Sequence, residues 1–240
     1  SGLPRQSNFP YWTGPDFDFP EMEAIRKQMD SLETLYPAST YFQYSNFGLA
    51  ILGAVVESIS GMSYEDYVSK NILDVLDLKD TRPFMPADLL KAQLATGYSA
   101  ITRSGTRYAM DPFFTKGITA AAGFTSTVED LSKFASWQFR LLESGSTEVI
   151  RASTLREMHR VHWMDPDWQT SWGLGFSVRK QGDQTVVGHG GSCPGYRTQL
   201  ALTPKNKMAY VIMFNATDIN TSRYVNTLMA VIGIGLDAKQ

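Results

Sequence analysis

The sequence from Tyr44 to Val56 reads Tyr-Ser-Asn-Phe-Gly-Leu-Ala-Ile-Leu-Gly-Ala-Val-Val, and it joins an extended polar segment to an apolar helix. The residues after Asn46 are apolar or small, which is typical of a helix that forms part of a core. Tyr44 and Asn46 carry side chains that suit proton transfer and substrate contact. Because both lie at the start of a buried helix, we expect them to be held rigidly, as a positioned general base requires.

Other segments of the chain also have helical patterns. The helix from Asn46 is predicted to end near Gly61, since glycine favours the left-handed position after a helix, and Ser63 begins a capping pattern for the next helix. Two further segments, Glu21–Leu35 and Thr127–Leu142, place apolar residues at three- and four-residue spacing, which predicts helices. Ser153–Trp163 is another helical candidate.

From Trp172 onward the pattern changes to short strands separated by turns. The predicted strands cover residues 175–179, 184–189, 196–204 and 208–215, and a turn or short hairpin is expected earlier, within residues 96–107. Short turns make the four strands antiparallel. Ser222–Leu236 then has one apolar side, which predicts a helix lying across the sheet. The expected fold class is therefore α+β, with a mostly helical lobe over residues 1–165 and a sheet with its helix over residues 166–240.

The composition indicates a folded protein and excludes several classes. Of 240 residues, 43% are hydrophobic, 12% aromatic and 19% charged, with a formal net charge of −2. This charge gives no reason to expect a nucleic-acid partner. The longest apolar runs are far shorter than the roughly 20 residues that span a bilayer, so no transmembrane segment is predicted. The single cysteine, Cys193, forms no internal disulfide.

A metal site is one alternative interpretation of His159, His162 and Asp165, which follow one another at three-residue spacing. Such spacing can place imidazoles on one helix face, but zinc sites usually need a further convergent ligand and supporting hydrogen bonds. The sequence shows neither. We therefore predict two surface histidines, no metal and no cofactor.

Three features together resemble a known superfamily. They are Tyr44-Ser45-Asn46, the helix start at Ser126-Thr127, and His189-Gly190-Gly191. In this order the chain resembles the serine β-lactamase and penicillin-binding-protein superfamily, in the branch with class C β-lactamases, family VIII esterases, D-aminopeptidases and LACTB-like proteases. Ser1-Gly2-Leu3-Pro4 is similar to the loop after the first active-site helix of those proteins. The resemblance implies a β-lactamase/transpeptidase-like fold, and it favours an exported, periplasmic location.

The resemblance also implies roles for individual residues. Tyr44 would be the general base, Asn46 would bind a substrate amide or carbonyl, and His189 would line the pocket from an edge strand. Gly190 and Gly191 would let a substrate backbone approach, and the N–H of Ser192 would be an oxyanion donor. A bulge or a strand-end turn is the structural alternative for the paired glycines.

The nucleophile of the superfamily is missing from its expected place. Members carry Ser-x-x-Lys on a helix upstream of the Ser-Gly-Leu-Pro loop, whereas this chain begins at that loop and has its one match at Ser177–Lys180, in a predicted strand. Residues three apart in a strand face opposite sides, roughly 10 Å apart. An unperturbed tyrosine has a pKa near 10, so a tyrosine anion at neutral pH needs a neighbouring cation. The lysine that would supply this cation is also missing, and Tyr44 is therefore expected to stay protonated. Cys193 is expected to be a pocket-rim residue, because no cation or helix start is predicted beside it to activate the thiol.

The sequence therefore favours a serine hydrolase acting on ester, amide or peptide bonds through an acyl-enzyme. The chain itself is expected to be a truncated form that lacks the nucleophile and is inactive alone. Two alternatives stay open: a non-catalytic module that binds a peptide or a cell-wall fragment, and a fragment that needs a complementing N-terminal polypeptide or self-association. The expected ligand is a small molecule or a peptide.

Overall fold

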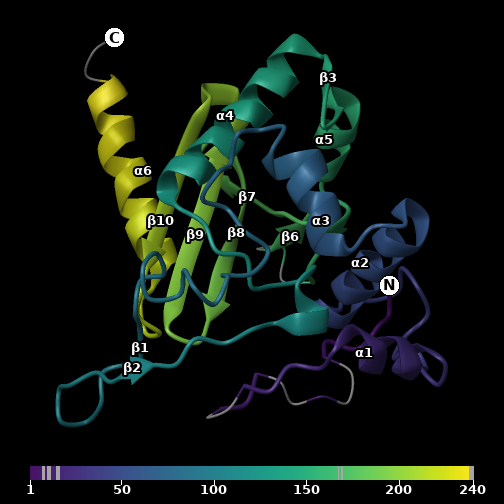
Figure 1. Cartoon of the computed structure of the whole chain (residues 1–240). Helices are drawn as coiled ribbons and strands as arrows, with labels where there is room; N and C mark the ends of the chain where they lie inside the picture. Colours follow the sequence, from purple (N-terminus) through teal and green to yellow (C-terminus); the bar gives the residue numbers. More distant parts are fainter. Residues whose placement is uncertain (7–8, 10–11, 15–16, 167, 169, 238–240) are drawn as a thin grey trace. The chain divides into compact units, whose positions relative to one another are not determined.

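The computed structural model describes residues 1–237 except 7, 8, 10, 11, 15, 16, 167 and 169 (Figure 1). Contacts divide the chain into two units. Unit 1 is Ser1–Leu94 with Pro112–Ser126, and unit 2 is Ala95–Asp111 with Thr127–Gln240. Each unit is described by itself. The division expected between residues 165 and 166 stays a prediction.

Unit 1 is built around helix α2 (Asn46–Ser60). Its core consists of five residues that are at most 1% exposed, from α1, α2, a 3-10 turn and the loop before α1. These are Phe19, Ile25, Phe47, Ala50 and Ile118. The other helical elements of this unit are α1 (Met22–Met29), α3 (Tyr64–Val68), a π-helical turn η1 (Ser69–Leu73) and the 3-10 turn η2 (Lys116–Ile118).

Local signals set the ends of α2 and α3 as predicted. The Ser45 hydroxyl accepts a hydrogen bond from the N–H of Gly48 at 2.8 Å, and Gly61 ends the helix with φ +69°. Ser63 caps α3 by accepting from the N–H of Asp66 at 3.1 Å. The helix predicted to reach Leu35 was wrong at its end, because α1 stops at Met29.

Unit 2 contains a six-stranded antiparallel sheet in the order β10-β9-β8-β7-β6-β5. Its strands are β5 (Trp163–Met164), β6 (Ser171–Trp172), β7 (Ser177–Gln181), β8 (Gln184–Cys193), β9 (Tyr196–Thr203) and β10 (Met208–Phe214). The four long strands were predicted, whereas the two-residue strands β5 and β6 were missed. The turn or hairpin expected within residues 96–107 is present, but its second strand lies beyond that range, because β1 (Gly97–Tyr98) pairs with β2 (Ala109–Met110).

Helices cover the sheet of unit 2. Helix α6 (Thr221–Asp237) packs on β9 and β10, and Figure 1 shows it in yellow beside them. Helix α4 (Val128–Ser144) packs on β10 and on α5 (Ala152–His159). The helix predicted to run to Trp163 therefore ends earlier, and β3 (Thr147–Glu148) with β4 (Ile150–Arg151) precedes it.

Two apolar clusters show which helices cover the two faces of this sheet. Val186, on β8, packs with Val225 and Met229 of α6, whereas the next residue, Val187, packs with Met158 of α5. Successive residues of a strand face opposite sides of a sheet. Helices together with an antiparallel sheet and its C-terminal helix confirm the predicted α+β architecture.

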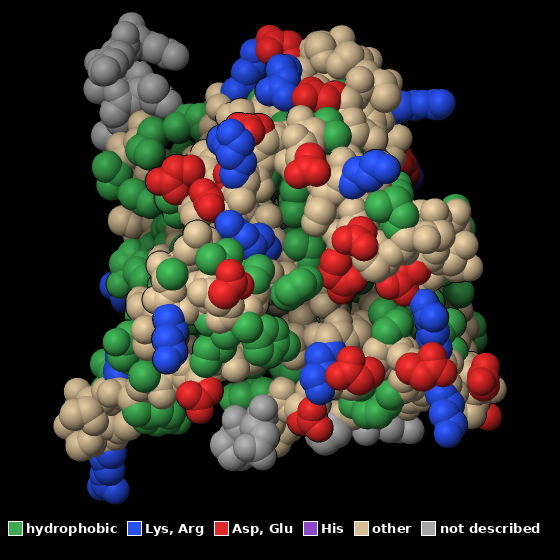
Figure 2. Space-filling model, viewed as in Figure 1, with side chains coloured by type: hydrophobic (Ala, Val, Ile, Leu, Met, Phe, Trp, Pro, Cys, Tyr) green, Lys and Arg blue, Asp and Glu red, His purple; other side chains and the backbone are tan. Residues whose placement is uncertain are grey.

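The described residues contain no single helix that is long and apolar enough to cross a membrane. One bent pair, Asn46–Ser60 with Tyr64–Leu73 at 77°, meets the length and composition limits when the two are taken together. Figure 2 shows basic and acidic side chains interspersed on the viewed face. That mixture agrees with the net charge of −2.

Candidate active site

The triplet Tyr44-Ser45-Asn46 lies at the start of α2, in unit 1, and Ser45 fixes it in two directions. Its hydroxyl accepts from the N–H of Gly48 and donates to the carbonyl of Pro4 at 2.6 Å. The backbone of Ser45 is extended, with φ −138° and ψ 104°. Asn46 is 6% exposed and is the first residue of the helix, and Tyr44 is half-buried. Ser45 therefore anchors the triplet at the start of α2, and the rigid holding of the Tyr44 and Asn46 side chains stays a prediction.

Arg5 also contacts the start of α2 and Tyr44, and the sequence did not reveal this residue as part of the candidate site. Its carbonyl accepts from the N–H groups of Asn46 at 3.0 Å and Phe47 at 3.2 Å, which satisfies two donors at the start of α2. Its guanidinium carbon lies 5.3 Å from the ring centroid of Tyr44, within the range of a cation–π contact. The structure thus places a cation beside Tyr44, over the face of its ring, where the sequence suggested none.

The second part of the predicted site lies on β8, in unit 2. β7 pairs with β8 only as far as Gly188, which lies opposite Ser177. β9 pairs with β8 without interruption from Val187 to Cys193. Among the described strands, none pairs with the other edge of residues 190–193. This half of β8 is thus a local edge. The expectation that His189 lies on an edge strand was wrong, because β8 is an inner strand that loses its β7 partner only beyond Gly188. The uninterrupted pairing excludes the bulge considered for Gly190 and Gly191.

The register shows where the backbone groups of this edge point. The hydroxyl of Ser177 donates to the carbonyl of Gly188 at 2.9 Å, so that carbonyl is directed towards β7. Alternate residues of a strand direct their N–H and C=O groups to the same edge. Gly190 and Ser192 follow at two and four residues, and their N–H and C=O groups are therefore directed to the open edge.

His189 and Trp172 are close neighbours at this edge. The Nδ1 atom of His189 lies 2.7 Å from the carbonyl oxygen of Gly190, to which it donates. The indole of Trp172, on β6, has its ring centroid 6.5 Å from that of His189, at an interplanar angle of 51°. Its Nε1 donates to Asp165 at 3.5 Å. Trp172 was not predicted as a site residue, because only the pairing of β6 with β7 brings it here.

The predicted site residues thus form two groups. Unit 1 holds Tyr44 with Asn46, and unit 2 holds His189 with Gly190, Gly191 and Ser192. The Beta-lactamase family model matches residues 1–233, a range that includes both groups. The chain belongs to the β-lactamase family.

Known proteins resemble this member of the β-lactamase family over nearly its whole length. Beta-lactamase-like protein 2 of Dictyostelium discoideum is 26% identical over 238 residues, which are 96% of this chain and 42% of that protein. The chain thus spans less than half the length of that relative. The octameric penicillin-binding protein homologue from Pyrococcus abyssi has a TM-score of 0.78 at 24% identity, covering 97% of this chain and 55% of that one.

A third comparison is a D-amino acid amidase. The enzyme from Ochrobactrum anthropi SV3, complexed with L-phenylalanine amide, has a TM-score of 0.71 at 21% identity, and the match covers 90% of this chain and 61% of that chain. Together the comparisons confirm the predicted superfamily and its β-lactamase/transpeptidase-like fold. The family is one of serine hydrolases.

The one Ser-x-x-Lys sequence of this β-lactamase-family chain has the geometry of a strand. Ser177 and Lys180 belong to β7, whose residues all pair with β8. The Ser177 hydroxyl is bonded to the carbonyl of Gly188, and Lys180 is exposed. Both observations agree with the prediction that Ser177 is not the nucleophile.

Cys193 has the properties of an unreactive thiol. Burial raises the pKa of Cys193 to about 11, and the nearby charge of Arg197 only partly opposes this effect. The Arg197 guanidinium also donates to the carbonyls of Cys193 at 3.2 Å and Tyr196 at 2.9 Å, which fixes the turn between β8 and β9. A thiol that is protonated at neutral pH does not have the properties of a nucleophile, and the rim position of Cys193 stays a prediction.

The two histidines considered for a metal site have different environments. His162 is exposed, as predicted, and its Nε2 lies 2.9 Å from the carbonyl of Glu157. The prediction was wrong for His159, which packs edge-to-face on Phe176 with ring centroids 4.8 Å apart and bonds Gln138 at 2.9 Å. Within the described residues, no group of three His, Cys, Asp or Glu side chains could hold a metal ion.

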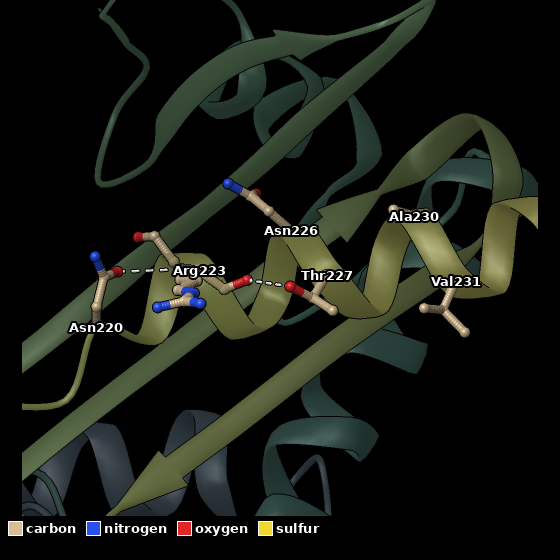
Figure 3. Close-up of a pocket in the computed structure, with 7 residues that line it drawn as sticks. Asn220, Arg223, Asn226, Thr227, Ala230 and Val231 are labelled. Carbon is tan, nitrogen blue, oxygen red and sulfur yellow. Dashed lines mark hydrogen bonds between the residues drawn. The ribbon is translucent and has the colours of Figure 1, made fainter.

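A surface pocket on α6 lies apart from these residues within unit 2. It is lined by polar residues of the first turns of the helix and by Ala230 and Val231 (Figure 3). Asn220 accepts from the N–H of Arg223 at 3.1 Å, and Thr227 donates to the carbonyl of Arg223 at 2.9 Å. These bonds serve the helix itself, and we assign the pocket no catalytic role.

Proposed function

We propose that the chain carries the substrate-binding and proton-accepting residues of a serine hydrolase that cleaves ester, amide or peptide bonds through an acyl-enzyme, and that residues 1–240 lack its nucleophile. The observation that carries this proposal is the open edge of β8, where Gly190 and Ser192 direct their backbone groups away from β9. A substrate backbone would add to this edge as an extra strand, and the N–H of Ser192 would donate to the developing oxyanion. Gly190 and Gly191 have no side chains to obstruct that approach.

The residues at the start of α2 would supply the remaining polar groups of the reaction. Tyr44 would accept the proton of the nucleophile, and Asn46 would hydrogen-bond the substrate amide or carbonyl. Support comes from the anchoring of this segment at the start of α2 by Ser45 and Arg5. Positioned polar groups accelerate acyl transfer because they need no reorganisation at the moment of reaction.

Small amides and peptides are the substrates that we favour. The structurally similar D-amino acid amidase is known in complex with L-phenylalanine amide, a small amide. We extend this substrate class to the present chain as part of the proposal. Fold similarity alone does not define a substrate, so a panel of amides, esters and β-lactams is the appropriate screen.

Residues 1–240 should not form an acyl-enzyme by themselves. They hold one Ser-x-x-Lys sequence, and its serine is bonded within the sheet. We expect no covalent label from a fluorophosphonate or a penicillin probe, as measured by intact-protein mass, and no hydrolysis of an activated ester. A serine hydrolase of known activity in the same reaction controls for the probes. Stoichiometric labelling would contradict this proposal, and loss of the label in Ser177→Ala would then locate it.

A non-catalytic binding module is the second candidate. The same open edge would recognise a peptide or a cell-wall fragment without cleaving it. The gene sequence upstream of Ser1 separates the two candidates, since a Ser-x-x-Lys sequence a few dozen residues before it supports the hydrolase. Its absence, together with peptide binding to the intact chain by calorimetry, would favour the binding module.

An exposed apolar stripe on α2 supports a further proposal, that the chain pairs with a complementing polypeptide or with itself. The stripe consists of Leu49, Leu52, Val55 and Ile59, which are 39%, 57%, 43% and 82% exposed. Spacings of three and four residues place them on one side of the helix. The one charged residue of α2, Glu57, is paired with Arg26 at 2.7 Å instead of lying in this stripe. Exposed apolar stripes of this kind commonly mark interaction surfaces.

A further inference from the structure

Arg179, on β7, forms a hydrogen bond to the first turns of α6. It lies opposite Val186, whose side chain packs on α6, whereas its neighbour Val178 belongs to the apolar cluster on the other face of the sheet. Residues paired across two strands share a face, so Arg179 projects on the α6 side. Its Nη2 donates to the Oδ1 atom of Asn226 at 2.9 Å, and its Nη1 donates to the Oε1 atom of Gln181 at 2.7 Å.

Both hydrogen-bond partners of Arg179 are neutral, and no described carboxylate forms an ion pair with it. Arg140, in the same unit, instead pairs with Glu148 at 2.9 Å. Burial lowers the pKa of Arg179, because partial removal from water disfavours the charged form, and no described acidic neighbour opposes this effect. A half-buried guanidinium in such surroundings is stabilised by an added anion.

The two amides beside Arg179 present further donor groups. A guanidinium has no acceptor, so each amide directs its oxygen towards Arg179 and its NH₂ group away from it. Within the part of the chain that the structure describes, neither the Nε2 of Gln181 nor the Nδ2 of Asn226 has an acceptor. Asn226 is exposed, and Gln181 is half-buried. These NH₂ groups therefore await an acceptor from outside the described chain.

The surface pocket on α6 adjoins this cluster. Arg223 and Asn226 both line it, on successive turns of the helix (Figure 3). Arg223 is exposed and forms no ion pair with a described residue, and the described residues of the pocket lining include no acidic side chain. A second positive charge thus lies on the solvent side of the amide of Asn226, with no described carboxylate to neutralise it.

We propose that Arg179, Gln181 and Asn226 bind a small oxyanion, a carboxylate or a phosphate group, at the surface of β7 and α6. Guanidinium groups pair with both kinds of anion through parallel N–H···O bonds, and the amide NH₂ groups would bond the remaining oxygens. Arg223 would add attraction from the pocket. The inference does not depend on the hydrolase proposal, since none of these residues takes part in the proposed reaction.

Binding is tested by NMR titration of the whole 240-residue chain, with sodium phosphate and sodium acetate as separate probes. The backbone amide signals of β7 and α6 are followed in about 0.1 M sodium chloride, which screens exposed charges beyond about 10 Å. At least one probe should bind with a Kd of about 1 mM or below, and the tighter probe identifies the ligand as a phosphate or a carboxylate. No binding of either probe up to about 10 mM would overturn the inference.

Two variants remove the site in different ways. Arg179→Gln removes the charge and should weaken binding at least about 10-fold. Asn226→Asp places a carboxylate beside the guanidinium, so it should weaken binding at least about 10-fold by competition and raise the urea midpoint of unfolding. The matched controls Arg103→Gln and Gln93→Glu make the same charge changes at exposed residues and should bind like the parent chain. Equal weakening by Arg103→Gln, or parent-like binding by Asn226→Asp, would indicate general surface attraction and overturn the inference.

Discussion

At the scale of single residues, His159 is the side chain whose environment departs furthest from that expected of a surface histidine. Burial lowers the pKa of His159 from 6.5 to about 4. Its ring lies between Phe176 and the Gln138 amide oxygen, which accepts from Nε2. The neutral ring is therefore the form that fits the contact between α4 and α5.

This environment predicts a pH-dependent stability. The unfolded chain binds a proton at His159 near pH 6.5 and the folded chain only near pH 4, so acid favours unfolding between these values. The contribution is complete above pH 6.5 and falls by up to about 3 kcal/mol by pH 4. Urea unfolding at several pH values measures it. His159→Gln should remove this component and His162→Gln should retain it, and identical pH profiles for all three proteins would contradict the assignment.

Cys193 gives a second prediction for a single residue. Because burial raises its pKa to about 11, the thiolate fraction at pH 8 is about 100-fold below that of an ordinary thiol. Iodoacetamide should therefore modify the folded chain about 100-fold more slowly than the chain in urea. Mass spectrometry follows the reaction. Equal rates in the two conditions would show an accessible, activated thiol and would reopen its role as a nucleophile.

The residues of the candidate site differ in how well their sequence indicates them. Tyr44, Asn46 and His189 belong to short motifs that are recognisable within a few residues. Arg5 lies over the ring of Tyr44, which is far from it along the chain. Trp172 lies beside His189 because its strand, β6, pairs with β7. No local pattern encodes such contacts, and the sequence therefore did not reveal these two residues.

At the scale of elements, the start of α2 depends on more than its cap. Ser45→Ala removes the cap to Gly48 and the bond to Pro4, whereas Ser63→Ala removes only the cap of α3. We expect a loss of about 2 kcal/mol for the first variant and about 1 kcal/mol for the second, measured by urea unfolding. Equal losses would mean that the bond to Pro4 contributes nothing to the stability of α2.

The glycines of β8 have different structural requirements, which a pair of alanine variants can separate. A Cβ on Gly188 would overlap the backbone carbonyl of Leu200, so Gly188→Ala should cost about 2–4 kcal/mol. A Cβ on Gly190 would come closest to the flexible amide end of Gln199, at 2.9 Å, and its one backbone neighbour, the carbonyl oxygen of Thr198, lies at an ordinary contact distance of 3.6 Å. Gly190→Ala should therefore cost less than about 1 kcal/mol in urea unfolding and act mainly on ligand binding. Equal destabilisation would contradict the proposed role of Gly190 at an open edge.

Elements with strong local signals were predicted best. The helix Asn46–Ser60 has a serine cap and a terminal glycine, and its bounds agree with the prediction. α1 ends early because the chain turns away, and the N–H of Leu35 donates to the carbonyl of Gly2 at 2.8 Å instead of continuing the helix. β5 and β6 are two residues each, too short for an alternating pattern, and their pairing is decided by tertiary contacts.

At the scale of the whole chain, the exposed apolar stripe on α2 is considered together with the greater length of the related proteins. The chain covers 42% of the Dictyostelium relative, so that protein contains further polypeptide that these residues do not represent. Exposed apolar stripes commonly mark surfaces that contact another polypeptide. The exposed stripe on α2 therefore supports the proposal that the chain pairs with a complementing polypeptide or with itself.

The stripe predicts association of the isolated chain through α2. Leu52→Lys with Ile59→Lys should convert a self-associated species into a monomer, because each charge would be desolvated in the contact. Light scattering after size-exclusion chromatography measures the mass. The matched control is Leu228→Lys with Val231→Lys on α6, which are 42% and 62% exposed and add the same charge. That control should keep the parent mass. A monomeric parent chain, or equal dissociation by both double variants, would rule out α2 as the surface of self-association.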